Sequence, residues 1–283
     1  MYDAGSLSET SAHQRARGAL DVSFKQRDGR TVLDRLRQEG CLKARFPRVE
    51  PNAWTMAVTL NSSGGVAGGD SLRFAFTAGQ GTKACVAGQA AERFYRSVAG
   101  GTPAEVRTRL TVASGAALEW LPQETILFDR AVLDRRLHIE LASDASFLGI
   151  EAIVFGRLAM GEQVRRGWLR DLIRVRRGGD LILHDAIRLD GEIGALLSRR
   201  AIGGDARALA TIVHVAPDAE ARLSGLRDAL TAVRSAAEAA ASAWNGMLVV
   251  RVLAPDSAAL RLTVMEALEV LRDGRPLPRV WMC

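Results

Sequence analysis

Four segments of the chain share a pattern in which apolar residues alternate, a short turn follows, and apolar residues resume. They read FAFTAGQGTKACV (74–86), LTVASGAALEWL (110–121), IELASDASFLGI (139–150) and IRVRRGGDLILH (173–184). Alternation with a period of two is typical of half-buried strands, and a turn between two of them favours a β-hairpin. The segments start 36, 29 and 34 residues apart, too irregularly for a strict solenoid. We predict a mainly β fold of packed antiparallel sheets built from repeated hairpins; an unrelated series of hairpins is the alternative, since turn sequences resemble one another.

The N-terminal end is polar and then enters a further hairpin. Residues 1–18 lack the apolar stretch of a signal peptide, and we expect a disordered tail there, with residues 19–283 forming a single domain. Within residues 19–47, apolar and polar residues alternate before Asp28-Gly29, a dipeptide typical of tight hairpin turns.

The last third of the chain carries two helical patterns. Apolar residues spaced three and four apart predict one helix that opens near Pro217 and a second over residues 257–273, capped by Gly274. Residues 236–254 are ambiguous, because their alanines favour a helix whereas an Asn-Gly pair favours a turn into a strand. We therefore expect about two helices near the C-terminus.

The charge balance points to an acidic partner. The net charge is +6 and the isoelectric point about 9.9, which raises the case for a nucleic-acid-binding module. However, the arginines are spread along the chain without a dense basic run, and aromatic residues make up only 5%. We interpret the charge as a basic surface suited to acidic partner proteins, with no nucleic acid bound. Three distant cysteines without a CxxC motif, and no long apolar run, predict a soluble cytoplasmic protein with no membrane partner.

Residues 60–72, LNSSGGVAGGDSL, form a glycine-rich loop between two expected strands. A phosphate-binding loop would place a lysine after its last glycine, but Gly69 is followed by Asp70. A dinucleotide fingerprint has a different glycine spacing and opens a helix, whereas a strand follows here. We interpret the loop as a tight junction between strands. Its glycines allow positive φ and close approach of another backbone or a partner, and it presents Asp70.

A carbohydrate hydrolase is the alternative function. Glu119 and Glu124 in LEWLPQE could supply the carboxylate pair that such enzymes use in a β-sandwich. Against it, the aromatic residues that line sugar-binding grooves are sparse, and neither a GxSxG elbow nor an HExxH motif is present. The four histidines are scattered, so no histidine and cysteine cage for a metal is expected.

Three acidic residues beside apolar strand residues are candidates for holding a metal transiently: Asp70, Glu151 and Asp185. The competing interpretation is a carboxylate bonded to backbone or arginine within a sheet. Two other segments, AERFYRS (91–97) and VRRGWLRDLIRVRR (164–177), are either docking surfaces or strands with charged outer faces.

Five motifs occur in a fixed order along the chain: LNSSGGVAGGD, AAERFYRS, LEWLPQETILFD, FGRLAMGE and LPRVW. Together, from about residue 19 to the end, they resemble the urease accessory protein family UreD, called UreH in some organisms. The resemblance implies a non-enzymatic scaffold of β-strands with a pair of helices. It also implies a complex with UreF and the GTPase UreG on apo-urease, which helps to deliver nickel supplied by UreE. Nickel would pass in transit through a polar tunnel, with no cofactor tightly bound.

The resemblance also implies roles for single residues. Asp70 matches the aspartate that ends the family's GGxxGGD motif, and Glu151 and Asp185 match acidic positions before and after its GR…GE motif. We predict these three as carboxylates of a nickel path, with Glu162 as a further candidate. Carboxylates and water release a divalent cation, whereas a histidine and cysteine cage would trap it.

The sequence departs from the family pattern at two places. Asn61-Ser62-Ser63 stands where the family has His or Thr before the first glycine pair, which weakens a metal role at that end of the loop. Arg130 stands where the family reads FDGA, so the turn differs there or Arg130 tolerates it.

Overall fold

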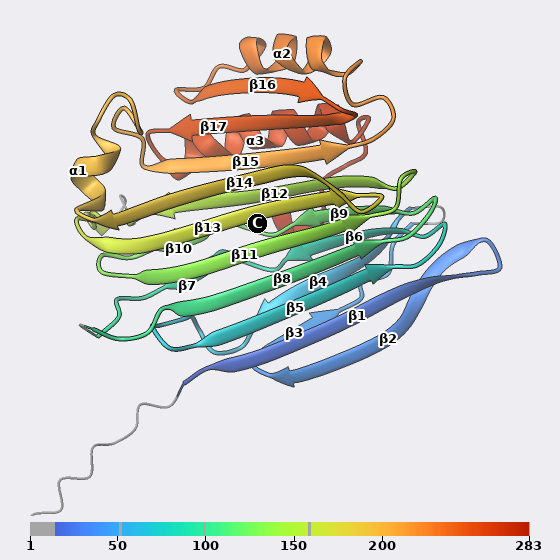
Figure 1. Ribbon diagram of the computed structural model, residues 1–283, viewed down its shortest axis with the longest axis horizontal. Helices are drawn as coiled ribbons and strands as arrows, with labels where there is room; N and C mark the ends of the chain where they lie inside the picture. The colour runs from blue at the N-terminus through green and yellow to red at the C-terminus, as the bar shows by residue number, and fades with distance from the viewer. Residues whose placement is uncertain (1–14, 51–52, 99, 158–159, 283) are drawn as a thin grey trace, which may run out of the picture.

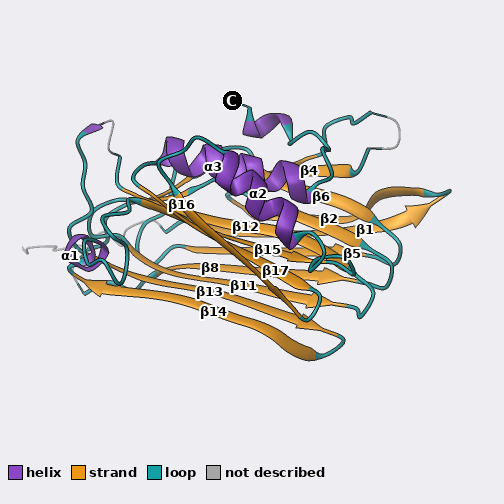
Figure 2. Cartoon of the chain, turned by 90° about the horizontal axis from the view of Figure 1, so that it is seen from above, coloured by secondary structure: helices purple, strands orange, loops and turns teal. Residues whose placement is uncertain are grey.

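Two β-sheets and a layer of helices make up the fold (Figures 1 and 2). The computed structural model describes residues 15–50, 53–98, 100–157 and 160–282, so residues 1–14 of the predicted tail lie outside the described residues. In this part of the chain, one sheet has seven strands in the order β14 (Asp180–Gly191), β13 (Gly167–Arg177), β11 (Val132–Leu141), β8 (Ala104–Val112), β5 (Ser71–Ala78), β1 (Arg17–Arg27) and β2 (Arg30–Gly40).

The second sheet has ten strands within the described residues. Its main path runs β16 (Glu238–Trp244), β17 (Met247–Ala254), β15 (Ala208–Val215), β12 (Ser146–Phe155), β9 (Ala117–Leu121), β6 (Lys83–Gly88), β4 (Thr55–Asn61) and β3 (Leu42–Arg45). The short strands β10 (Thr125–Leu127) and β7 (Glu92–Phe94) branch from β12. The helices are α1 (Ile193–Leu197), α2 (Leu223–Ala232) and α3 (Ser257–Leu271), and a 3-10 turn follows at Arg279–Trp281.

The ten-stranded sheet is covered on both faces. One apolar core fills the space between the two sheets, and a second lies between the ten-stranded sheet and helices α2 and α3 (Figure 2). Strands covered on both faces read as continuous apolar runs, and β15 is buried at every position. The mainly β fold with helices near the C-terminus is therefore confirmed.

The pairing of the repeated segments differs from the predicted hairpins. In three of the four segments, the turn carries the chain from the seven-stranded to the ten-stranded sheet, so β5 is followed by β6, β8 by β9, and β11 by β12. Successive copies then pair in parallel, as β5 does with β8 and β6 with β9. A tight turn fixes the reversal of the chain, but whether its two strands share a sheet depends on strands distant in sequence.

True hairpins occur where local turn chemistry is strongest. The strands β1 and β2 pair antiparallel around Asp28 and Gly29, whose φ values are 50° and 74°. The ambiguous stretch before residue 254 forms the hairpin of β16 and β17 around Asn245 and Gly246, with φ values of 51° and 65°. Positive φ at both central residues is the requirement of the type I′ turn. The last of the four segments is also a hairpin, made by β13 and β14.

Candidate functional site

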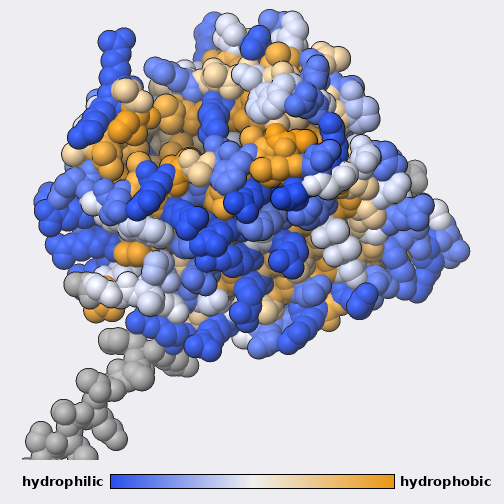
Figure 3. Space-filling model, viewed as in Figure 1, coloured by the Kyte–Doolittle hydropathy of each residue, from blue (hydrophilic) through white to orange (hydrophobic). Residues whose placement is uncertain are grey.

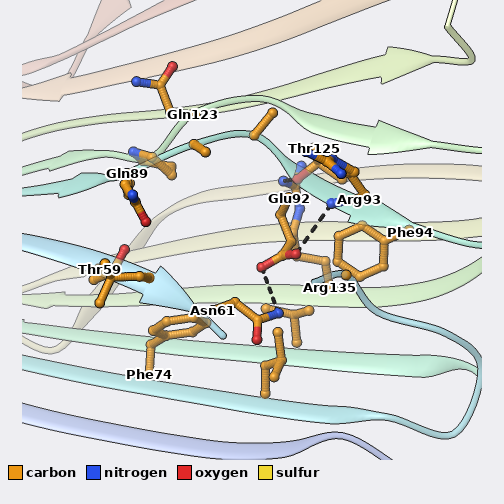
Figure 4. A pocket seen from close by; sticks show the side chains of 18 of the residues that line it. Thr59, Asn61, Phe74, Gln89, Glu92, Arg93, Phe94, Gln123, Thr125 and Arg135 are labelled. Atoms are coloured by element: carbon orange, nitrogen blue, oxygen red, sulfur yellow. Dashed lines mark hydrogen bonds between the residues drawn. The ribbon is translucent and has the colours of Figure 1, made fainter. Parts of the chain in front are cut away.

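A cavity of about 220 Å³ lies between the two sheets, next to the glycine-rich loop (Figure 4). Its walls come from the inner faces of β4, β5, β8, β9, β11 and β12 and from residues 88–94. Phe74 and Trp120 contribute apolar surface, and a set of polar side chains adds oxygen and nitrogen atoms: Thr59, Asn61, Gln89, Glu92, Arg93, Thr108, Gln123, Thr125, Arg135 and Glu151. The cavity is thus a polar space inside an otherwise apolar sandwich.

The glycine loop closes one side of this cavity because its backbone pairs with the segment after β7. Val66 donates its N–H to the carbonyl of Arg93 at 2.8 Å and accepts from Tyr95 N–H at 2.8 Å. Gly65 has φ +142°, and a Cβ there would overlap the ring of Tyr95. The interpretation of the loop as a tight junction between strands is confirmed.

A buried charge cluster stands at the deep end of the cavity. Arg135 on β11 donates from Nε and Nη2 to the two carboxylate oxygens of Asp171 at 2.8 and 2.7 Å. Its Nη1 lies 2.6 Å from Glu151 Oε2 and donates to Thr125 at 2.8 Å. Trp120 Nε1 donates to Glu151 Oε1 at 2.9 Å. One guanidinium therefore faces two carboxylates, which leaves the cluster with a formal charge of −1 when all three groups are ionised.

The electrostatics of this cluster follow from its burial. Burial alone would lower the pKa of Arg135, but Asp171 and Glu151 outweigh it and raise that pKa. Burial raises the pKa of Glu151, while Arg135 opposes this effect and Asp171 adds to it. The cluster is therefore short of positive charge, and a cation that enters the cavity would be attracted to it.

The cavity also contains a carboxylate that carries no arginine partner. Glu92 on β7 accepts from Asn61 Nδ2 at 3.0 Å and from its neighbour's backbone, Arg93 N–H, at 3.3 Å (Figure 4). Burial raises the pKa of Glu92, and the hydrogen bond from Asn61 offsets part of that rise. Within the described residues no ion pair involves this carboxylate, although the nearby charge of Arg93 also lowers its pKa. Sequence reasoning missed it, because a three-residue strand gives no periodic signal.

Of the three residues predicted for a nickel path, Glu151 lines the cavity. Asp70 lies outside the cavity lining, and its two oxygens accept from the backbone N–H groups of Ala16 and Ala67, both at 2.8 Å. These bonds tie the glycine loop to the start of β1. A metal role for Asp70 stays a prediction, and it would require these bonds to open.

Asp185 lies on β14 at the far side of the sandwich. It accepts from Arg251 Nη2 at 2.6 Å, and Arg251 Nη1 reaches Thr211 Oγ1 at 3.5 Å. The strand register places Thr211 directly opposite Glu151 on one side and Arg251 on the other. A polar row thus crosses the inner face of the ten-stranded sheet and links the buried cluster to Asp185. Its role in a nickel path stays a prediction.

Glu162, the further candidate, lies elsewhere. It is half-buried in a loop and pairs with Arg157 at 2.9 Å. Arg130, which stands where the family has glycine, adopts the positive φ of +64° that glycine favours, so the turn tolerates Arg130. In AERFYRS, Phe94 at the end of β7 is buried, whereas Tyr95 is partly exposed and packs edge-on against the Phe128 ring at 4.9 Å.

The hydrolase alternative is contradicted by the placement of Glu119. This residue points to the helix side of β9, is 1% exposed, and is held by Arg272 at 3.0 Å and Arg275 at 2.7 Å. Glu124 pairs with Arg261 at 3.2 Å. A sealed, doubly neutralised carboxylate cannot reach a glycosidic bond, so the two glutamates do not form a catalytic pair.

Two features are absent from the described part of the chain. No group of three or more His, Cys, Asp or Glu side chains in that part of the chain is arranged to hold a metal ion. Among the same residues, no helix has both the length and the apolar character that crossing a bilayer requires.

Comparison with known proteins identifies the family. The family model described as UreD urease accessory protein matches residues 16–282. The urease accessory protein UreD of Xanthobacter autotrophicus is 49% identical over 276 residues, covering 98% of this chain and 93% of the relative. The UreD of a Methylobacterium species is 51% identical over 256 residues, covering 89% of both chains. That of Azorhizobium caulinodans is 46% identical over 268 residues, covering 95% of this chain and 97% of the relative. The chain therefore belongs to the UreD family of urease accessory proteins.

Proposed function

We propose that this chain is a cytoplasmic, non-enzymatic scaffold of urease maturation that passes nickel through the cavity between its two sheets. It works in a complex with UreF and the GTPase UreG on apo-urease, and it holds nickel only in transit. Its membership of a family of urease accessory proteins supports the link to urease. The observation that carries the nickel path is the negatively charged polar interior of the sandwich.

Burying charged side chains in this interior costs folding free energy. Replacing a buried ion cluster by packed apolar side chains is often neutral or stabilising, so stability alone gives no reason for Arg135, Glu151 and Asp171 to stand in the core. An excess of carboxylate over guanidinium there instead suits a passing cation. Functional use of the cluster is therefore the simpler explanation of its presence.

The carboxylates along the cavity suit release as well as capture. Glu92 stands on β7 without an arginine, and Glu151 stands in the deep cluster. A nickel ion would meet one or two carboxylate oxygens at a time and would complete its coordination with water and neutral oxygens such as those of Asn61 and Thr125. Such a shell exchanges readily, which a carrier in transit requires.

Reconstituted activation of urease tests the proposal. The chain is purified with UreF, UreG and apo-urease, and urease activity is measured at limiting nickel. We expect Glu92→Gln and Glu151→Gln to lower activation while the complex still assembles, and Glu238→Gln, an exposed carboxylate on β16, to leave it unchanged.

Two results would overturn the proposal. One is normal activation without the chain, together with no co-purification with UreF or apo-urease. The other is activation by both cavity variants that equals the Glu238→Gln control. Because Glu92 has no ion pair to lose, its variant separates loss of nickel transfer from loss of folding.

A further inference from the structure

The outer face of the seven-stranded sheet carries two cross-strand rows of basic residues. The register aligns Arg73 on β5, Arg107 on β8 and Arg136 on β11 in one row. Arg109, His138 and Arg174, on β8, β11 and β13, form the next row. Figure 3 shows hydrophilic side chains over the centre of this face. We call these six residues, together with Arg170 on β13, the basic face.

Several of these arginines have no counter-charge. Arg107 and Arg136 share Asp134, at 3.1 and 2.7 Å, and Arg107 also pairs with Glu105 at 3.3 Å. By contrast, no carboxylate in the described part of the chain forms an ion pair with the remaining arginines, Arg73, Arg109, Arg170 and Arg174. Elsewhere arginines commonly find partners, as Arg222 does with Asp218 and Asp273. The basic face therefore keeps positive charge that the fold does not neutralise.

The centre of the face is hollowed. A shallow trough of about 420 Å³ lies over the sheet, because Ala19 and Ala75 have small side chains. The register places Ala19 between Arg73 and Glu39, and it places Ala75 between Arg109 and Asp21. Its rim includes Arg73, Arg109 and Arg136. A guanidinium presents its donors as a planar fork that binds a carboxylate through two parallel hydrogen bonds. The trough thus offers space for acidic side chains and donors to receive them.

His138 lies within the positive potential of these arginines. Its ring lies between Arg109 and Arg174 in the row, and its buried Nε2 has no hydrogen-bond partner among the described atoms. Burial lowers the pKa of His138, and Arg174, Arg109 and Arg136 lower it further. An anion bound across Arg109 and Arg174 would reverse that electrostatic contribution and raise the pKa.

We propose that the basic face is a docking surface for an acidic surface of a different protein. Together the rows span three strand spacings, about 14 Å, which suits a protein contact better than a small anion. Asp21 and Glu39 on the trough rim would repel a continuous phosphate backbone, but a protein surface of mixed charge accommodates them. With a net charge of +6, a second copy of this chain is a poor electrostatic match. This inference does not depend on nickel transfer.

Binding of a labelled acidic peptide to the full chain tests the proposal. The probe is a short peptide of alternating glutamate and serine, compared with a serine–glycine peptide and a short DNA duplex by fluorescence anisotropy at low and raised salt. Each exposed ion pair contributes about twofold to fivefold in affinity, so Arg73→Gln/Arg109→Gln/Arg174→Gln is expected to weaken peptide binding about tenfold or more. The pKa of His138, followed by NMR, is expected to rise when the peptide binds.

The matched control is Arg48→Gln/Arg200→Gln/Arg234→Gln, which removes the same charge from exposed positions off this face. We expect it to weaken binding less than about threefold, through net charge alone. Equal losses in the two triple variants would overturn the proposal, as would an unchanged His138 pKa. Tighter binding of DNA than of peptide, lost in the same face variant, would assign the surface to nucleic acid instead.

Discussion

Removing the guanidinium of Arg135 should lower the free energy of unfolding, because it is the counter-charge of two buried carboxylates. The change Arg135→Met keeps similar side-chain volume but deletes four polar contacts, two to Asp171 and one each to Glu151 and Thr125. Both carboxylates remain buried without a counter-charge. Breaking a buried ion pair by removing one partner costs about 3–5 kcal/mol of folding free energy, and two stranded carboxylates place this variant in that range.

The loss should depend on pH in a defined direction. Burial and Asp171 already raise the pKa of Glu151, and without Arg135 the opposing effect disappears, so its folded pKa rises further. A carboxyl with a raised folded pKa binds more protons in the folded than in the unfolded state. Stability is therefore greatest below the unfolded pKa of about 4.3 and falls as pH rises through the folded pKa, by about 1.4 kcal/mol per unit. The variant should recover part of its stability on acidification from about pH 7.5 to 5.

Urea unfolding followed by circular dichroism measures both effects. The control is Arg136→Met, the next residue along, which is half-exposed on the outer face and pairs with Asp134; its loss should stay near 1 kcal/mol. Adding Glu151→Gln and Asp171→Asn to Arg135→Met should restore much of the stability, because no buried charge is then left unpaired. A loss for Arg135→Met below about 1 kcal/mol, or one independent of pH, would refute the reasoning.

Gly65→Ala should destabilise the chain by about 1–3 kcal/mol more than Gly64→Ala in thermal melts, because only the added Cβ at Gly65 overlaps Tyr95, whereas Gly64 faces open space. Glu119→Gln should cost about 3 kcal/mol in urea titrations, since it leaves the buried Arg272 and the half-buried Arg275 without their carboxylate partner, and a change within 0.5 kcal/mol would contradict this. Burial lowers the pKa of His214 to about 4, so the unfolded state binds more protons and stability falls as pH drops from about 6.5 to 4; His214→Gln should flatten that slope in melts over this range.

Hairpin turns and helix ends are the features that the sequence predicts best in this chain. Asn245-Gly246 and Asp28-Gly29 lie at hairpin turns and have positive φ, which asparagine, aspartate and glycine tolerate. Helix α3 begins after Asp256, whose carboxylate accepts from Ala259 N–H at 2.8 Å, and Gly274 follows it with φ +68°. In contrast, β5, β8 and β11 pair in parallel with strands about thirty residues away, and no turn sequence determines that pairing.

For a related reason, the sequence predicts only part of the candidate site. Arg135 occupies a position between Leu133 and Leu137, which point to the core, and Asp171 sits likewise between Leu169 and Ile173. The sequence therefore shows a charged residue at an inward-facing position of each strand, but it does not show which residue of another strand is its partner. Only the fold shows that these two charges meet.

Glu151 and Asp185 are far apart in the sequence but are joined in the fold by a row of polar side chains. The strand register runs from Glu151 through Thr211 to Arg251, and Arg251 then crosses to Asp185 on the other sheet. Every member sits on an inner face, where each position would otherwise favour an apolar side chain. Asp70 stands apart from this row and holds backbone instead. The cavity lining includes Glu151 but not Thr211, Arg251 or Asp185. Between Glu151 and Thr211 the packed side chains leave no room for a water molecule. The row therefore joins the two carboxylates through packed side chains, and a nickel path from Glu151 toward Asp185 stays a prediction.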